Sequence, residues 1–155
     1  MFLAESRKHP ACRRLRGIPG LEAVRVALLI ARVQTPHRFP NRACFWGYLG
    51  LGLVRRDSAE YRLVEGRIVR RSKPVTIRGL NPNHQPELKA IFKSAPLAVI
   101  RRPGPFKDYY DQRVEQGRKP ELLRLNVARK LAALTLSLWK KGGRYRAEAV
   151  KPRQA

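Results

Sequence analysis

The stretch that decides the fold runs from Leu15 to Leu21 and reads Leu-Arg-Gly-Ile-Pro-Gly-Leu. Gly17 and Gly20 bracket the apolar Ile18 and stand directly before a segment with helical periodicity. Glycine lets a backbone turn sharply and approach another group closely, and the amides at the start of the next helix point toward an anion placed there. The stretch therefore predicts a tight hairpin whose backbone can bind an anion.

This hairpin has the form of the turn in helix-hairpin-helix DNA binders. Such a turn contacts backbone phosphates, which positions a duplex without reading its sequence. A plain Gly-Pro turn ahead of a helix would contain the same residues. The charge of the chain favours the DNA-binding interpretation, with Gly17, Ile18 and Gly20 as the contacts.

Length and composition indicate one basic domain. The 155 residues are 43% hydrophobic, which is enough to form one core. The chain carries 34 Lys and Arg against 11 Asp and Glu, a formal charge of +23 that calls for a polyanionic partner. Of these cations 24 are Arg and 10 are Lys, and the planar arginine fork, which binds phosphate through two bonds, favours nucleic acid.

Neither a disulfide framework nor a zinc site is predicted, because Cys12 and Cys44 stand far apart without Cys-x-x-Cys spacing. Residues 1–8 include Glu5, Arg7 and Lys8 and do not form a signal peptide. The longest apolar stretches, 26–31 and 131–139, are too short to span a membrane. We expect no membrane contact and a cytoplasmic, nucleoid-associated protein.

Helical periodicity surrounds the hairpin. Residues 21–33 predict a helix that ends before Pro36, with an inward stripe formed by Leu21, Val24, Ala27, Leu28 and Ala31. A short helix is expected over 42–48, with Asn41 as its N-cap and an exit at 50–52.

The next segment changes to strand periodicity. Residues 61–70 predict a β-hairpin that turns at Glu65 and Gly66. A lone two-stranded ribbon is marginal in water, so it should lie on the helices or on a partner. Pro86 can begin a helix, which Pro96 should kink or end.

Two further helices complete the chain, over residues 106–116 before Gly117 and over 120–139 before Gly142. The predicted fold class is mainly α, a helical domain that contains a helix-hairpin-helix motif and a small β-hairpin insertion. Its expected organisation is a truncated linker over residues 1–13, a DNA-binding domain over 14–145 and a basic tail over 146–155.

Several blocks, in this order and spacing, resemble transposases of the bridge-RNA-guided insertion sequences, the "IS one-ten" family. The resemblance covers residues 15–145 and implies the C-terminal domain of such an enzyme. The blocks are Gly17-Ile18-Pro19-Gly20, Arg38-Phe39, Phe45-Trp46-Gly47-Tyr48-Leu49-Gly50-Leu51, Gly79-Leu80-Asn81, Phe106-Lys107-Asp108-Tyr109-Tyr110, Ala128-Arg129-Lys130-Leu131 and Leu138-Trp139-Lys140-Lys141-Gly142.

The resemblance implies a nucleophilic serine shortly after the Tyr-x-Gly-Leu block, and Ser58 stands in that place. Arg55 and Arg56 could stabilise charge on a phosphate there, while Asp57 or Glu60 could assist proton movement. The sequence departs from the family pattern, since Ala59 and Glu60 replace the glycines that commonly follow the serine. The proline common after Gly-Leu is also missing at Val54. Without the resemblance, Ser58 would be an ordinary loop serine.

The resemblance also implies an N-terminal RNase H-like domain in which four acidic residues hold divalent metal. This chain begins just before the hairpin, so the expectation is a truncated copy that lacks that domain. The acidic residues present do not form a two-metal pattern, and no metal site or other cofactor is predicted in this chain. Expected partners are DNA, a guide RNA, a separately encoded RNase H-like domain and further copies of the chain.

Basic residues spread along the chain as doublets and single cations predict several DNA contacts on a folded surface. The residues are Arg55, Arg56, Arg70, Arg71, Lys73, Arg78, Arg129 and Lys130. Two alternatives stay open. A structural RNA-binding protein would need neither the serine nor the hairpin, and a stand-alone helix-hairpin-helix DNA-binding module would need only the hairpin.

Overall fold

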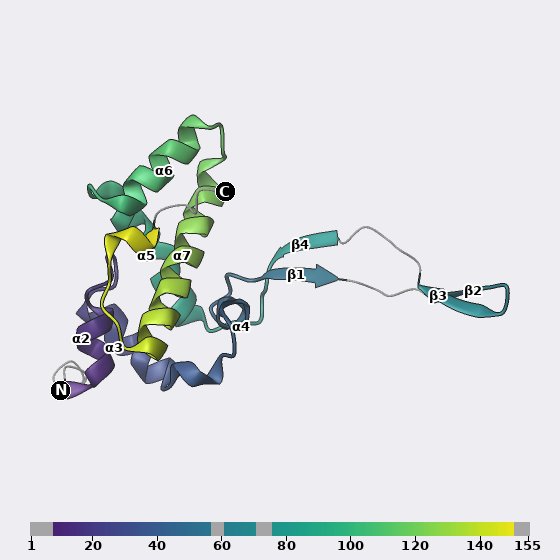
Figure 1. Ribbon diagram of the computed structural model, residues 1–155, viewed down its shortest axis with the longest axis horizontal. Coiled ribbons are helices and arrows are strands. Elements are labelled where there is room, and N and C mark those ends of the chain that lie inside the picture. Colours follow the sequence, from purple (N-terminus) through teal and green to yellow (C-terminus); the bar gives the residue numbers. More distant parts are fainter. Residues whose placement is uncertain (1–7, 57–60, 71–75, 151–155) are drawn as a thin grey trace.

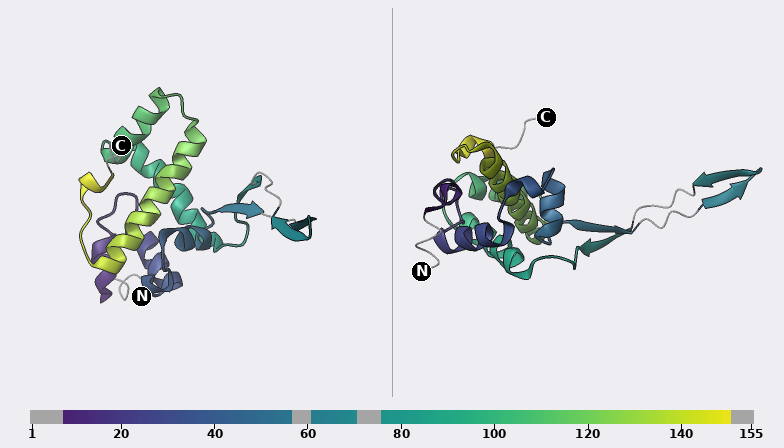
Figure 2. Two further views of the ribbon diagram at one scale, coloured as in Figure 1. Left: turned by 45° about the vertical axis from the view of Figure 1, so that its right-hand side comes forward. Right: turned by 90° about the horizontal axis from the view of Figure 1, so that it is seen from below.

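The computed structural model describes residues 8–56, 61–70 and 76–150. A body of packed helices carries a long β arm that extends away from it (Figure 1 and Figure 2). Three residues of the predicted site, Ser58, Arg71 and Lys73, lie outside the described residues. The mainly helical fold with a small β insertion is confirmed.

In the segment predicted to form a helix-hairpin-helix, a tight turn joins α2 (Pro10–Leu15) to α3 (Ala23–Val33). The turn is closed by backbone bonds: the amide of Gly17 donates to the carbonyl of Arg14, and the amide of Leu21 donates to the carbonyl of Ile18. α2 thus begins inside the segment predicted to be a linker.

The inward face of α3 agrees with the predicted one only in part, since Leu21 and Ala27 are buried as expected. Val24, expected inside, is 62% exposed, whereas Val26, Leu29 and Val33 are buried. Apolar residues occupy most positions of this helix, so periodicity alone allowed two stripes. Packing against α2 and α5 selected the other stripe.

The helix predicted over residues 42–48 is confirmed as α4 (Arg42–Tyr48), which follows the short 3-10 helix η1 (Pro36–Arg38). Asn41 caps α4 as expected, because its Oδ1 accepts a bond of 2.9 Å from the amide of Cys44. Phe45 and Leu49 are fully buried, so α4 is attached firmly to the body.

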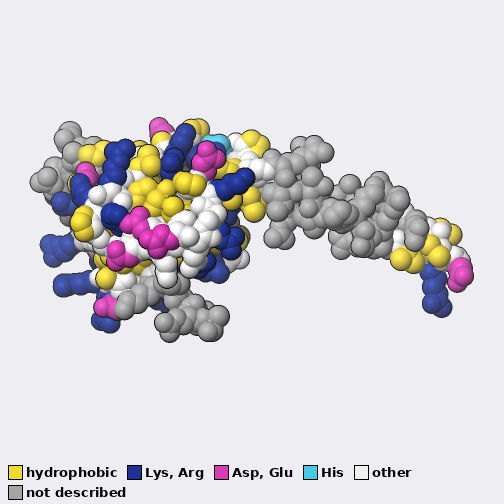
Figure 3. Space-filling model, turned by 90° about the horizontal axis from the view of Figure 1, so that it is seen from above, with side chains coloured by type: hydrophobic (Ala, Val, Ile, Leu, Met, Phe, Trp, Pro, Cys, Tyr) yellow, Lys and Arg dark blue, Asp and Glu magenta, His cyan; other side chains and the backbone are white. Residues whose placement is uncertain are grey.

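The arm begins where β1 (Leu53–Arg56) pairs antiparallel with β4 (Thr76–Leu80). Farther out, β2 (Tyr61–Val64) pairs with β3 (Arg67–Arg70) through the predicted turn, in which Glu65 and Gly66 both have positive φ. The β1–β4 pairing was not predicted. The outer hairpin does not lie on the helices (Figure 3). Its side chains Leu63 and Ile68 are 74% and 72% exposed.

Of the two outcomes predicted at Pro96, a kink or an end of the helix, the end is wrong. α5 (Pro86–Arg101) runs through Pro96, which is buried. Proline removes one helical hydrogen bond. The turns on either side bury Phe92, Ala95 and Val99, and this packing holds the helix together across the lost bond.

The remaining helices are α6 (Pro105–Glu115), α7 (Pro120–Lys141) and the 3-10 helix η2 (Ala147–Val150). The long α7 runs through the middle of the body and packs against α2, α4, α5 and α6 (Figure 1). Gly142 ends it in the left-handed conformation. Val150 is buried, so the chain folds back onto the body after α7. None of the described helices is both long and apolar enough to cross a membrane.

Candidate nucleic-acid interface

The hairpin lines a surface depression together with the first residues of α3. Arg16 and Arg102 supply its cations, and the other lining residues run from Gly17 to Val24. Ile18 is only 2% exposed, so it anchors the hairpin in the core and is not itself a surface contact. Of the three predicted hairpin contacts, the structure brings Gly17, exposed, and Gly20, half-buried, to the surface.

Gly20 fits closely against α5. Its φ is +79°, a left-handed conformation that favours glycine. A Cβ at this position would lie 2.9 Å from Val99 Cγ1 and 3.0 Å from the carbonyl oxygen of Ala95. The carbonyl of Gly20 accepts a bond of 2.6 Å from Arg25 Nη1. Gly20 therefore positions the hairpin against α5, in addition to the DNA contact predicted for it.

The first turn of α3 presents open amides beside the hairpin. The first four amides of a helix lack helical acceptors, and the N-cap residue Glu22 makes no side-chain bond to them. Arg16 and Arg102 are exposed next to this turn. Glu22 is the acidic group of the depression, and its Oε1 lies 3.9 Å from Arg102 Nη2. Amides, helix dipole and two guanidiniums together form a site for an anion such as phosphate.

The arm carries four of the predicted DNA-binding arginines at backbone positions that the structure describes. Arg55 and Arg56 lie on β1, opposite residues 77 and 76 of β4. Arg70 ends β3, and Arg78 lies on β4. Along the chain, Ser58 follows β1, so the predicted nucleophile belongs to a segment between two described strands.

Arg129 ties α7 to the base of the arm. Its Nε and Nη2 both donate to the carbonyl of Leu51, at 2.8 Å and 2.7 Å. Its guanidinium lies 5.7 Å from the ring centroid of Trp46, whose Nε1 donates to the Arg129 carbonyl at 3.1 Å. Burial lowers the pKa of Arg129. This guanidinium holds two parts of the fold together, a role that the sequence analysis missed.

Lys130 faces a different part of the structure. Its Nζ lies 4.4 Å from the ring centroid of Tyr109 on α6. Burial, and secondly the charge of Arg113, lower the pKa of Lys130. Sequence reasoning treated Arg129 and Lys130 as one basic doublet. Adjacent residues on a helix point about 100° apart, so the two cations contact different elements.

The described acidic residues do not fit a divalent-metal centre. Within residues 8–56, 61–70 and 76–150, no group of three or more His, Cys, Asp or Glu side chains could hold a metal ion. Carboxylates are engaged in ion pairs instead, namely Glu87 with Arg32 at 2.5 Å, Asp111 with Lys107, and Glu22 with Arg102.

Comparison with protein families places the chain beside known transposases. The model of a family described as "Transposase IS116/IS110/IS902 family" matches residues 12–111. The matched range starts in α2, includes the hairpin and the arm, and ends in α6. No curated protein matches the chain.

Proposed function

The chain belongs to the transposase IS116/IS110/IS902 family, and we propose that it binds DNA during transposition through the hairpin of residues 17–20. The observation that carries the proposal is the family match, which spans the hairpin and the arm together. The formal charge of +23 supports it, because phosphate contacts supply most of the affinity of non-specific DNA binding.

The hairpin supplies a physical means of binding. Open amides at the start of α3 and the guanidiniums of Arg16 and Arg102 surround a space in which a backbone phosphate fits. Hydrogen bonds from amides and guanidiniums to phosphate are charge-assisted and strong. Buried Ile18 and the close contact of Gly20 with α5 keep the backbone rigid, so little conformational entropy is lost on binding.

This part of the proposal is tested with two double variants, each of which removes two positive charges. The hairpin pair is Arg16→Gln with Arg102→Gln, and the control pair is Arg118→Gln with Arg124→Gln; all four side chains are exposed. Affinity for a labelled duplex is measured by fluorescence anisotropy. The hairpin pair should weaken binding at least about tenfold more than the control pair, since a lost charged hydrogen bond costs roughly 1.5–3 kcal/mol. Equal losses would mean that net charge alone carries the binding and would refute the proposal.

We also propose Ser58 as the nucleophile, on the grounds of its place after the Tyr-x-Gly-Leu block and between arginine-bearing strands. In the proposed step the serine Oγ attacks a DNA phosphorus and an Oγ–P bond forms. The bond from phosphorus to the deoxyribose oxygen breaks, and the sugar leaves as an alcohol with the proton that the serine loses. Asp57 or Glu60 would pass that proton between the two oxygens.

A covalent adduct distinguishes this proposal from both alternative functions. End-labelled DNA is incubated with the chain and its proposed partners, a guide RNA and an RNase H-like domain. A covalent adduct of protein and DNA should then remain as a labelled band on an SDS gel. Ser58→Ala should abolish the band, and Ser72→Ala, a serine on the other connection of the arm, should leave it unchanged. An adduct that persists in Ser58→Ala would exclude this serine as the nucleophile.

The proposed partners beyond DNA are a guide RNA and an RNase H-like domain that holds divalent metal. Purification of the chain from its native cells, with and without ribonuclease treatment, tests the first of them. A specific RNA that copurifies and is lost after treatment supports a guide, and random RNA fragments would contradict it.

A further inference from the structure

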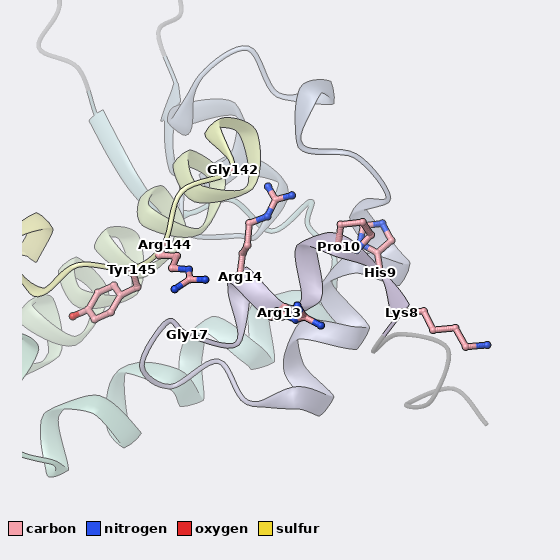
Figure 4. A pocket seen from close by; sticks show the side chains of 9 residues that line it. All are labelled: Lys8, His9, Pro10, Arg13, Arg14, Gly17, Gly142, Arg144 and Tyr145. Carbon is pink, nitrogen blue, oxygen red and sulfur yellow. The ribbon is translucent and has the colours of Figure 1, made fainter.

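A second cationic depression adjoins the hairpin at Gly17 (Figure 4). It has a cavity volume of about 700 Å³. Three segments line it: the start of α2, the hairpin at Gly17, and the chain that follows α7. The lining residues are Lys8, His9, Pro10, Arg13, Arg14, Gly17, Gly142, Arg144 and Tyr145.

The lining is strongly basic. Arg13 and Arg14 come from α2 and Arg144 comes from beyond α7, so cations from opposite ends of the chain converge there. The described lining includes no acidic side chain. Like charges brought together repel each other, and a bound anion removes that repulsion. The arrangement is thus suited to a ligand with negative charge.

The fold holds one of these arginines in place. Gly142 ends α7 with φ +76°, and a Cβ there would lie 2.8 Å from Arg14 Nη1. The guanidinium of Arg14 therefore packs against the C-terminus of α7, where the helix dipole favours a cation. Arg13 and Arg144 are exposed at the rim, and their guanidiniums are free of this packing role (Figure 4).

His9 adds a hydrogen-bond donor. Its Nδ1 accepts a bond of 3.2 Å from the amide of Ala11, so Nε2 carries a proton. That nitrogen can donate to a phosphate oxygen. The hydroxyl of Tyr145 points away from the arginines in Figure 4, which leaves the ring as an apolar wall of the depression.

Gly17 lines both this depression and the hairpin depression. We propose that the pocket formed by α2 and the chain after α7 binds a backbone phosphate of the same DNA strand that the hairpin holds. The inference rests on the proposed function and extends the DNA contact from the hairpin to the C-terminal end of α7. Arginine forks and an imidazole N–H are groups that bind phosphodiester oxygens.

The test uses the full chain and a labelled duplex, with a pocket pair, Arg13→Gln and Arg144→Gln, beside the hairpin and control pairs. All three pairs lower the net charge by the same amount. The control pair is remote from the pocket. Arg124 lies 18 residues before Gly142 along α7, which is about 27 Å at 1.5 Å per residue. Circular dichroism and the melting temperature establish that each variant is folded.

The pocket pair should weaken duplex binding at least about fivefold more than the control pair. The slope of log K against log salt concentration should also fall by about 1, as expected for the loss of one phosphate contact. Losses equal to those of the control pair in both affinity and slope would overturn the inference. The hairpin pair would still test the proposed function in that case, so the two failures are distinguishable.

A single-stranded RNA of the same sequence forms the second arm of the experiment. A pocket that holds the DNA strand gives a specific loss for the duplex. If the pocket pair weakened RNA binding and left duplex binding at the control level, the depression would be an RNA site and the inference would be wrong.

Discussion

Replacement of Gly20 by alanine tests whether the hairpin packs against α5 as the structure has it. Two costs add at this position. Alanine in the left-handed conformation costs roughly 1–2 kcal/mol. The new Cβ would lie 2.9 Å from Val99 Cγ1 and 3.0 Å from the Ala95 carbonyl oxygen, and overpacking of this kind costs about 1–3 kcal/mol. Gly20→Ala should therefore lower the free energy of unfolding by about 2–5 kcal/mol.

Gly117→Ala is the matched control. Gly117 has φ +78°, almost the value of Gly20, but a Cβ there would meet no atom within 4 Å. This variant should lose only the conformational part, roughly 1–2 kcal/mol. Both variants are compared by urea unfolding followed through the fluorescence of Trp46 and Trp139.

A double-mutant cycle identifies the contact itself. Val99→Ala removes the Cγ1 atom that lies nearest the new methyl, so Gly20→Ala should cost less in that background, with a coupling of about 0.5–3 kcal/mol. Equal losses for Gly20→Ala and Gly117→Ala, with no coupling to Val99, would refute the packing of the hairpin against α5.

Three other outcomes follow from side-chain contacts. Arg129→Lys should lower the free energy of unfolding by about 1–3 kcal/mol, because lysine cannot reproduce the two bonds to the Leu51 carbonyl; an unchanged urea midpoint would contradict that role. Asn41→Ala should cost about 1 kcal/mol through loss of the α4 cap, and Asn41→Ser should recover most of it in the same assay. Burial, and secondly Glu148, raise the pKa of Tyr145, and its buried hydroxyl has no hydrogen-bond partner among the described residues. The stability that this raised pKa contributes is complete below pH 10 and is lost as the pH rises through the folded-state pKa. Tyr145→Phe should therefore be at least as stable as the unmodified protein at pH 8, and its free energy of unfolding should fall less above pH 10. A parallel decline in both proteins would contradict this.

Local chemistry was readable from the sequence alone. The turn at Gly17 and Gly20, the Asn41 cap and the turn at Glu65 and Gly66 all depend on residues within a few positions of each other. The helix ends at Gly117 and Gly142 were also predictable from local residues, because glycine accepts the left-handed conformation that ends a helix. The family resemblance likewise depended on the order of short blocks, and the family match over residues 12–111 confirms the transposase assignment.

Tertiary structure alone decided which surfaces these elements present. Val24 is exposed and Pro96 lies inside a helix because α3 and α5 pack on distant segments, and the energy of that packing exceeds local preference. Arg129 donates a hydrogen bond to Leu51, and Arg13 lines the same depression as Arg144, although the residues of each pair lie far apart in the chain. Periodicity reports the faces of one element at a time, whereas these contacts depend on how several elements pack together.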